Sequence, residues 1–103
     1  MDNVKYKLEA DLTDAVKNWL DTQNDLYYTK VSDRFKKGIP DILMCVQGIF
    51  VAAELKAGNN TPSPHQRFFI KKIIDVGGIG GTCYTLRQVK VLIDEARRIA
   101  PKN

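Results

Sequence analysis

The hydrophobic and polar positions of the chain follow two periods, which together predict three helices and four strands. Apolar residues recur at helical spacing over residues 3–22, 64–76 and 86–100. Shorter apolar or β-prone runs lie at 27–31, 41–46, 49–56 and 82–85. The predicted order is helix, three strands, helix, strand, helix. This order is typical of an α/β fold with a mixed sheet flanked by helices.

Local signals mark where the second and third helices begin. Ser63, Pro64 and Gln66 are the residue types preferred at the N-cap, N1 and N3 positions of a capping box. Gly77 is a residue type that commonly ends a helix, and Thr85 can cap the helix that follows. The apolar stripe of the first helix is less well delimited, and we take it to begin at Val4.

The two central strands carry charged residues where apolar ones are expected. Their turn is centred on Gln47 and Gly48, a register that places Asp41 opposite Glu54. The two Cβ atoms would then lie about 5 Å apart, and like charges in such a pair destabilise a sheet. Lys56 projects from the same face and neutralises part of the charge. Two carboxylates near a backbone carbonyl also suit Mg²⁺ or Mn²⁺, which prefer oxygen ligands.

Two polar residues fall within the apolar stripes of predicted helices. Glu9 points in nearly the same direction as Leu20, and Gln66 aligns with Ile70 and Ile73. Buried polar groups need partners, and one shared polar site would provide them. Simpler interpretations stay open: Gln66 can merely complete the capping box, and Glu9 can extend to water. Likewise, Glu54 and Lys56 can be ordinary solvent-facing strand residues.

The length and the net charge of the chain limit the number of domains and the kinds of partner that we expect. The 103 residues suit one domain, residues 1–103, and the net charge is +4. The basic residues cluster in Lys30–Lys37 and Arg67–Lys72, which indicates either a polyanionic partner or a solvated surface. The candidates for contacts with a nucleic-acid backbone are Arg34, Lys36, Lys37, Arg67 and Lys71. Aromatic residues alternate little with these charges, so the pattern predicts no platform for stacking single strands.

Cysteine placement and hydropathy indicate an intracellular protein. Cys45 and Cys83 lie in apolar runs without metal-binding spacing, so we expect two buried free thiols. No apolar run reaches the eighteen or so residues of a membrane span, and the first residues lack a signal-peptide core. We therefore expect no membrane association and a cytoplasmic location.

Pro40-Asp41 followed by Glu54-Leu55-Lys56 resembles the PD-(D/E)xK nuclease signature, and a wider pattern is similar to the VRR-NUC family of virus-type replication-repair nucleases. The wider pattern consists of Gly38-Ile39-Pro40-Asp41, the apolar hairpin, Glu54-Leu55-Lys56, Ser63-Pro64 before Gln66, and Gly77-Gly78 before the last strand. The resemblance covers nearly the whole chain. The length of the chain is similar to that of the stand-alone phage type. Thr13 departs from the pattern, because many members have Gln there.

The resemblance implies a fold, a set of roles and an assembly. The implied fold is the restriction-endonuclease-like αβββαβ core, here with an extra C-terminal helix. The implied metal ligands are Asp41, Glu54, the Leu55 carbonyl and Glu9, directly or through water; Lys56 would be the catalytic lysine and Gln66 the glutamine of the following helix. Stand-alone members are similar in size to Holliday-junction resolvases and tend to form dimers, so a homodimer is implied here.

The expected activity is metal-dependent hydrolysis of DNA phosphodiester bonds, on branched or junction DNA. In this chemistry a cation lowers the pKa of a water, and Lys56 activates that water or stabilises charge at phosphorus. The main alternative is a non-catalytic nucleic-acid-binding module in which the acids form a structural ion cluster. A sequence-specific restriction enzyme and a protein–protein adaptor with a coincidental Glu-x-Lys are further alternatives.

Overall fold

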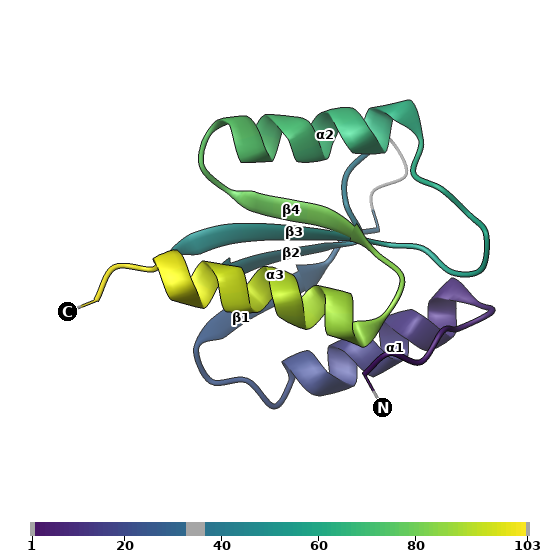
Figure 1. The fold of residues 1–103 in the computed structure, drawn as a ribbon, viewed down its shortest axis with the longest axis horizontal. Coiled ribbons are helices and arrows are strands. Elements are labelled where there is room, and N and C mark those ends of the chain that lie inside the picture. Colours follow the sequence, from purple (N-terminus) through teal and green to yellow (C-terminus); the bar gives the residue numbers. More distant parts are fainter. Residues whose placement is uncertain (1, 33–36, 103) are drawn as a thin grey trace.

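Figure 1 shows the chain in a computed structural model, which describes residues 2–32 and 37–102. The elements follow in the order α1 (Glu9–Leu20), β1 (Leu26–Lys30), β2 (Ile42–Val46), β3 (Ile49–Leu55), α2 (Pro64–Asp75), β4 (Ile79–Cys83) and α3 (Leu86–Ile99). The predicted order of three helices and four strands is therefore confirmed, and the fold is α/β.

The four strands form one mixed sheet in the spatial order β1-β2-β3-β4. β1 and β3 both pair with β2 in antiparallel fashion, whereas β3 and β4 are parallel and α2 connects them. In the β2–β3 hairpin Ile42 pairs with Ala53 and Val46 with Ile49. This is the register predicted from the turn. Continued by one residue beyond Ile42 and Ala53, it pairs Asp41 with Glu54.

The turn between β2 and β3 has positive φ at both central residues. Gln47 has φ of 51° and Gly48 has φ of 89°, the backbone signs of a type I′ turn, whose twist matches that of the strands. Glutamine is an unusual residue at the first of these positions. Its side chain donates a 2.7 Å hydrogen bond from Nε2 to Asp25 Oδ2, a contact that helps to stabilise this turn.

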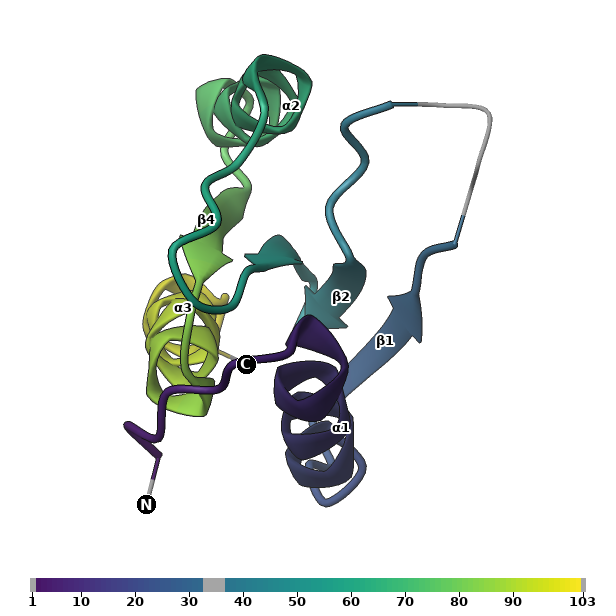
Figure 2. The same cartoon turned by 90° about the vertical axis from the view of Figure 1, so that its right-hand side faces the viewer.

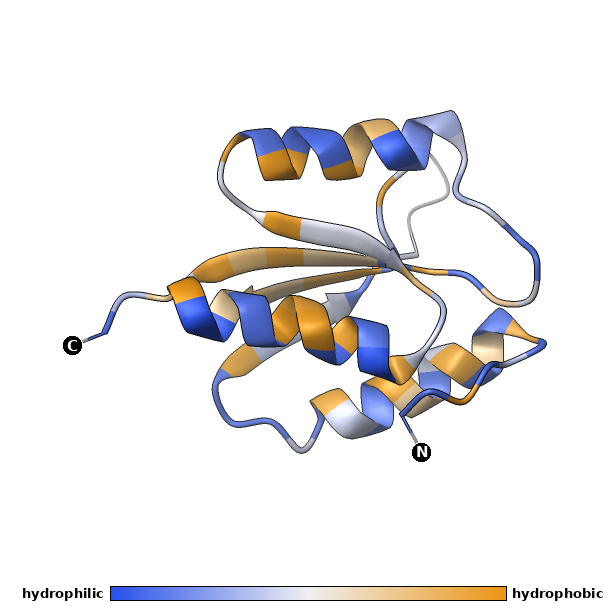
Figure 3. Ribbon diagram, in the orientation of Figure 1, coloured by the Kyte–Doolittle hydropathy of each residue, from blue (hydrophilic) through white to orange (hydrophobic). Residues whose placement is uncertain are grey.

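Helices cover the sheet from both sides. Figure 1 shows α2 on one face and α3 with α1 on the other, and Figure 2 shows α2 near β4 and away from β1. Figure 3 shows apolar residues on the sides of the helices that face the sheet. The main core lies between the sheet and the α1–α3 layer and contains Leu12, Val16, Leu20, Ile42, Met44, Val46, Val51, Ala53, Leu55, Cys83, Val89, Ile93 and Ala96. β3 is buried on both faces, which places Glu54 under α2.

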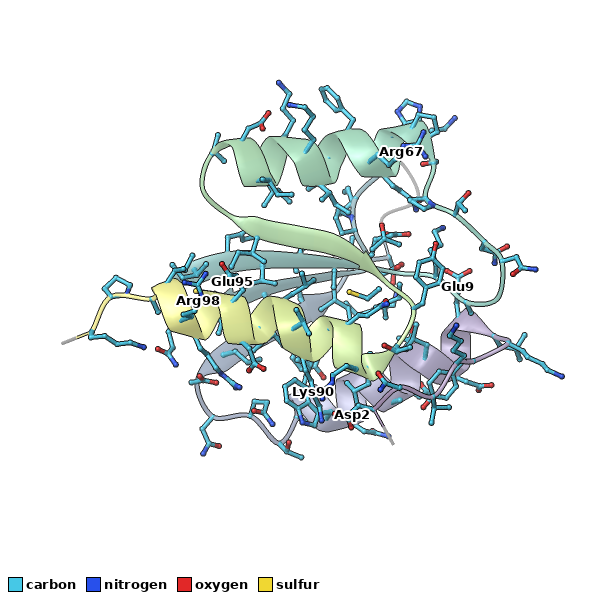
Figure 4. The ribbon with its side chains drawn as sticks, viewed as in Figure 1. Asp2, Glu9, Arg67, Lys90, Glu95 and Arg98 are labelled. Carbon is cyan, nitrogen blue, oxygen red and sulfur yellow. The ribbon has the colours of Figure 1, made fainter. Side chains whose placement is uncertain are left out.

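The first helix begins at Glu9, so the predicted start at residue 3 is wrong. Val4 and Leu8 are 47% and 62% exposed, although their spacing continues the helical stripe. The preceding segment instead contacts elements far along the chain. The Asp2 carbonyl accepts a hydrogen bond from the Arg87 amide, and the Asp2 carboxylate pairs with Lys90 Nζ at 2.9 Å. Figure 4 shows these last two side chains together beside α3.

The fourth strand was predicted at 82–85 but occupies Ile79–Cys83. Glycines in a strand usually weaken it, which is why the sequence pattern favoured a later start. Here they permit close packing of α2. A Cβ atom on Gly78 would lie 2.6 Å from Ile73 Cγ2, and one on Gly80 would lie 3.2 Å from Ile70 Cγ2. The bounds of the other strands differ from the predicted ones by one residue.

One of the two cysteines differs from its prediction. Cys83 is a buried free thiol, as expected, whereas Cys45 is exposed. Cys45 pairs with Phe50, itself 44% exposed, on the part of the sheet face that α2 leaves uncovered. In the part of the chain that the structure describes, no helix has both the length and the apolar character of a membrane span.

Candidate active site

Four predicted site side chains meet at one end of the β2–β3 hairpin. Asp41 immediately precedes β2, Glu54 is the penultimate residue of β3, and Lys56 follows that strand directly. Gln66 lies in the first turn of α2. The hairpin register brings Asp41 and Glu54 opposite each other, and the α2 start closes over them. The candidate site thus depends on three elements that the sequence predicted.

Glu54 is the central residue of this group and is 2% exposed. Its Oε2 accepts a 2.6 Å hydrogen bond from Gln66 Nε2 and lies 3.3 Å from Lys56 Nζ. Its Oε1 is buried and, among the described residues, has no hydrogen-bond partner. A buried polar atom without a partner destabilises a protein, and such atoms are uncommon in folded proteins. The Glu54 carboxyl can share a proton with Asp41, and with both acids ionised Glu54 Oε1 is available to a ligand.

The environment of Glu54 favours its protonated form. Burial, followed by the charge of Asp41, raises the pKa of the Glu54 carboxyl to about 7, although the Lys56 ammonium acts in the opposite direction. Perturbed carboxyl groups of this kind are common at functional sites. A cation binding beside Glu54 would oppose both causes of the shift and favour the ionised form.

Asp41 is held by the backbone of the neighbouring strand. Its Oδ2 accepts a 2.7 Å hydrogen bond from the Leu55 amide, while Oδ1 lies 3.8 Å from Lys30 Nζ. The amide contact orients the carboxylate beside Glu54. Sequence analysis did not single out Lys30. Its contact depends on the pairing of β1 with β2, for which the sequence offered no turn signal.

Gln66 forms contacts that fit both of the alternatives that the sequence left open. Its Oε1 accepts from the Ser63 amide at 2.8 Å, and its own amide donates to Ser63 Oγ at 3.2 Å, which completes a capping box. Because Oε1 is engaged in this way, Nε2 faces Glu54. Ser63 therefore orients the amide that contacts the central carboxylate, a function that the capping signal alone did not reveal.

Glu9 lies apart from these four residues. It is half-buried at the first position of α1, and Figure 4 shows it at the same end of the molecule as Arg67. Within residues 2–32 and 37–102 it forms no hydrogen bond or ion pair with Asp41, Glu54 or Lys56. Its predicted role as a ligand or an outer group stays a prediction.

The structure describes three of the five residues predicted to contact DNA. Lys37, Arg67 and Lys71 are exposed. Arg67 Nη1 donates to the Pro62 carbonyl at 2.7 Å, and Lys71 pairs with Asp75 at 2.8 Å. Lys71 is therefore partly neutralised, which weakens it as a phosphate contact. Arg34 and Lys36 lie outside the described residues.

The donor atoms at the site fit a hard divalent cation. Within the described ranges, three or more His, Cys, Asp or Glu side chains nowhere gather as a metal-binding group. The predicted set was Asp41, Glu54, the Leu55 carbonyl and Glu9, directly or through water. Without Glu9 it has two carboxylates and one carbonyl, and water commonly completes the coordination of Mg²⁺. The unpartnered Glu54 Oε1 beside Asp41 is the observation that supports this fit.

No protein-family model and no curated protein matches the chain. Among solved structures, the chain is similar to one described as a VRR_NUC domain, with a TM-score of 0.68 and 24% sequence identity. The match covers 84% of this chain and 94% of the other. The match confirms the predicted α/β fold, which the chain shares with this VRR_NUC domain.

Proposed function

We propose that the protein is a metal-dependent DNA endonuclease, with one nuclease domain over residues 1–103, that hydrolyses phosphodiester bonds. The observation that carries this proposal is the buried, unpartnered oxygen of Glu54 beside Asp41, Lys56 and Gln66. A structural ion cluster would be expected to pair its oxygens internally, whereas a binding site keeps one available. The VRR_NUC fold agrees with this assignment.

Asp41, Glu54 and the Leu55 carbonyl would hold Mg²⁺ or Mn²⁺, with Glu9 as a further ligand or an outer group. When bound, such a cation supplies charge neutralisation at the phosphate and a more acidic water. Lys56 orients the attacking water or stabilises the negative charge that develops at phosphorus. Gln66 holds Glu54 in place through the 2.6 Å hydrogen bond.

The substrate that we propose is branched DNA, with an activity like that of Holliday-junction resolvases. The support is the resemblance to stand-alone phage VRR-NUC proteins and the net charge of +4. Lys37 and Arg67 are exposed and lie close in sequence to Asp41 and Gln66, and with Arg34, Lys36 and Lys71 they are the proposed backbone contacts. With DNA as its substrate, the protein would act in the cytoplasm, that of the host if phage-encoded.

We also propose a homodimer, because a junction has two strands to cut and one domain has one site. Sedimentation at micromolar concentration tests this directly, and a monomer at every concentration would contradict it. The alternative function is a non-catalytic nucleic-acid-binding module. In that case Lys56 would stabilise two buried acids and would have no role in cleavage.

The deciding experiment compares a labelled four-way junction with a matched linear duplex, in Mg²⁺, Mn²⁺ or EDTA. Glu54→Ala and Lys56→Ala are tested beside the wild type, each checked for folding by circular dichroism. Lys90→Ala is the matched control, since Lys90 also pairs with an acid but lies outside the site. We expect cation-dependent cutting of the junction that both site variants lose and the control retains. Binding without cutting under every condition would favour the binding module.

A further inference from the structure

The second helix presents an exposed aromatic side chain two residues after Gln66. Phe68 is 61% exposed, and Val76 just beyond the helix is 86% exposed. Ile70 and Ile73 on the same helix are buried against the sheet, so packing of α2 does not require Phe68. Large apolar side chains that gather on a surface commonly mark a place where another molecule binds.

Phe68 lines an open hollow of about 520 Å³ whose lining combines apolar and basic side chains. Phe68, Phe69 and Val76 supply apolar surface, and Lys37, His65 and Lys72 supply the titratable groups. Among the described residues that line this hollow, none is acidic. Aromatic surface together with cationic side chains complements a base together with its phosphate.

Lys72 and Phe68 are already arranged as a pair. The Lys72 ammonium lies 5.2 Å from the centroid of the Phe68 ring, within the range of a cation–π contact. This contact holds a positive charge at the edge of the aromatic surface. A base stacked on the ring would bring its phosphate within reach of that charge.

The hollow adjoins the candidate active site through the segment that leads into β2. Gly38 has φ of +88°, and a Cβ atom there would lie 2.7 Å from the backbone carbonyl carbon of His65. Gly38 thus packs directly against α2 one residue before Gln66, which contacts Glu54. Lys37 in the lining of the hollow and Asp41 at the site belong to this same short segment.

We propose that this hollow binds an unpaired segment of a DNA strand, with a base stacked on Phe68 and phosphates near Lys37 and Lys72. The proposal rests on the nuclease function above and extends its proposed branched substrates to DNA with a single-stranded arm. It replaces the expectation, drawn from the sequence, that the chain has no stacking platform, because the fold brings Lys37 into one hollow with Phe68 and Lys72. A second copy of this chain is a poorer occupant. A two-fold contact through this hollow would bring two sets of the same basic side chains together.

The test measures binding without cleavage, by fluorescence anisotropy in EDTA. One labelled duplex carries a single-stranded thymidine arm, and the other is blunt. Stacking on one aromatic residue corresponds to about tenfold or more in affinity. We therefore expect Phe68→Ala to weaken binding of the armed duplex at least about tenfold and to leave the blunt duplex unchanged. Phe68→Trp should retain the affinity of the wild type, since indole also stacks.

Ile74→Ala is the matched control. Ile74 is an exposed apolar residue of the same helix, 51% exposed, but it lines a different hollow with Arg67 and Thr82. We expect no change in binding of either duplex. Lys72→Ala should weaken armed-duplex binding and reduce its salt dependence by about one unit of slope, as for one lost phosphate contact.

Two results would overturn the proposal. Phe68→Ala that weakens both duplexes equally would show a general contact instead of an arm-binding site. Phe68→Ala that leaves DNA binding intact but changes the sedimentation coefficient would assign the hollow to a contact between copies. Cleavage is not needed for either readout. A wild type that binds the armed duplex through Phe68 but never cuts DNA would therefore contradict the nuclease proposal alone.

Discussion

Burial of the Glu54 carboxyl links its protonation to the stability of the whole protein. The ordinary pKa of this group is 4.5, and burial with the charge of Asp41 raises it to about 7 in the folded state. Between these two values the folded protein keeps a proton that the unfolded chain has released. The folded state binds more protons in this window, so stability falls as pH rises through it.

Glu54→Gln removes this titration and keeps the shape of the protonated side chain. In EDTA we expect the wild type to lose on the order of 2–3 kcal/mol of unfolding free energy between about pH 4.5 and pH 8. The variant should lose less and be the more stable protein at pH 8. Urea unfolding across this pH range measures the difference. Parallel pH profiles for the two proteins would contradict the raised pKa.

The residues that sequence analysis identified are those whose positions depend on short-range geometry. Asp41, Glu54 and Lys56 follow from one turn and from the alternation of side chains along a strand. Cys45 was misassigned, because an apolar run does not reveal which sheet face a helix leaves open. The contact between Lys30 and Asp41 depends on pairing between strands separated by a long loop, which no local pattern determines.

At the scale of elements, the start of α2 combines a structural and a chemical task. Ser63 caps the helix and also fixes the amide of Gln66 that contacts Glu54. Thr85 caps α3 in the same way, by accepting from the Gln88 amide, but among the described residues it forms no hydrogen bond with Glu54 or Gln66. Removing each cap in turn therefore distinguishes an effect on helix stability from an effect on the geometry of the site.

We expect Ser63→Ala and Thr85→Ala each to destabilise the protein by about 1 kcal/mol, the usual effect of losing a cap. Ser63→Ala should in addition lower cleavage by less than about tenfold, because the lost Oγ contact loosens the first turn of α2 while the Ser63 backbone amide still holds Gln66 Oε1. Thermal unfolding and single-turnover cleavage below the unfolding range measure the two effects. Equal activity losses in both variants would show that the cap acts through stability alone.

Helix starts were predicted well where a capping residue marks them, whereas the start of α1 and the bounds of β4 were predicted poorly. α2 and α3 begin where Ser63 and Thr85 indicate. α1 lacks a side-chain cap, since Leu8 occupies that position, and its start depends on contacts of the preceding segment with α3. β4 contains glycines that allow α2 to pack closely against the strand. This packing is a property of the folded protein and cannot be read from the strand sequence alone.

At the scale of the whole molecule, one ion-pair network joins parts of the chain that are distant in sequence. Asp25, just before β1, accepts from Arg97 of α3 at 2.9 Å and from Gln47 of the hairpin turn at 2.7 Å. These contacts, with Arg97 first, lower the pKa of Asp25 from 3.8 to about 2. A depressed folded-state pKa gives stability that is present above pH 3.8 and lost as pH falls toward 2.

Asp25→Asn should therefore destabilise the protein by about 1 kcal/mol at pH 7, a value reduced for the solvent exposure of the pair. The difference from the wild type should shrink between pH 4 and pH 2. Glu95→Gln is the control, because Glu95 pairs with Arg98 on an exposed helix surface and such pairs contribute little. Figure 4 shows that pair near the end of α3. Equal effects of the two substitutions would contradict the special role of Asp25.

The shared use of Gln66 has a spectroscopic consequence. Its side-chain Oε1 accepts a hydrogen bond from the Ser63 amide, and its Nε2 donates one to Glu54. A change in the charge of Glu54, or a ligand bound to it, changes the strength of the hydrogen bond that Gln66 donates to it. The hydrogen-exchange protection of the first amides of α2 then changes as well. The backbone signals of Ser63 and Gln66 in a nitrogen-15 spectrum thus act as a built-in reporter of the site, readable without substrate or turnover.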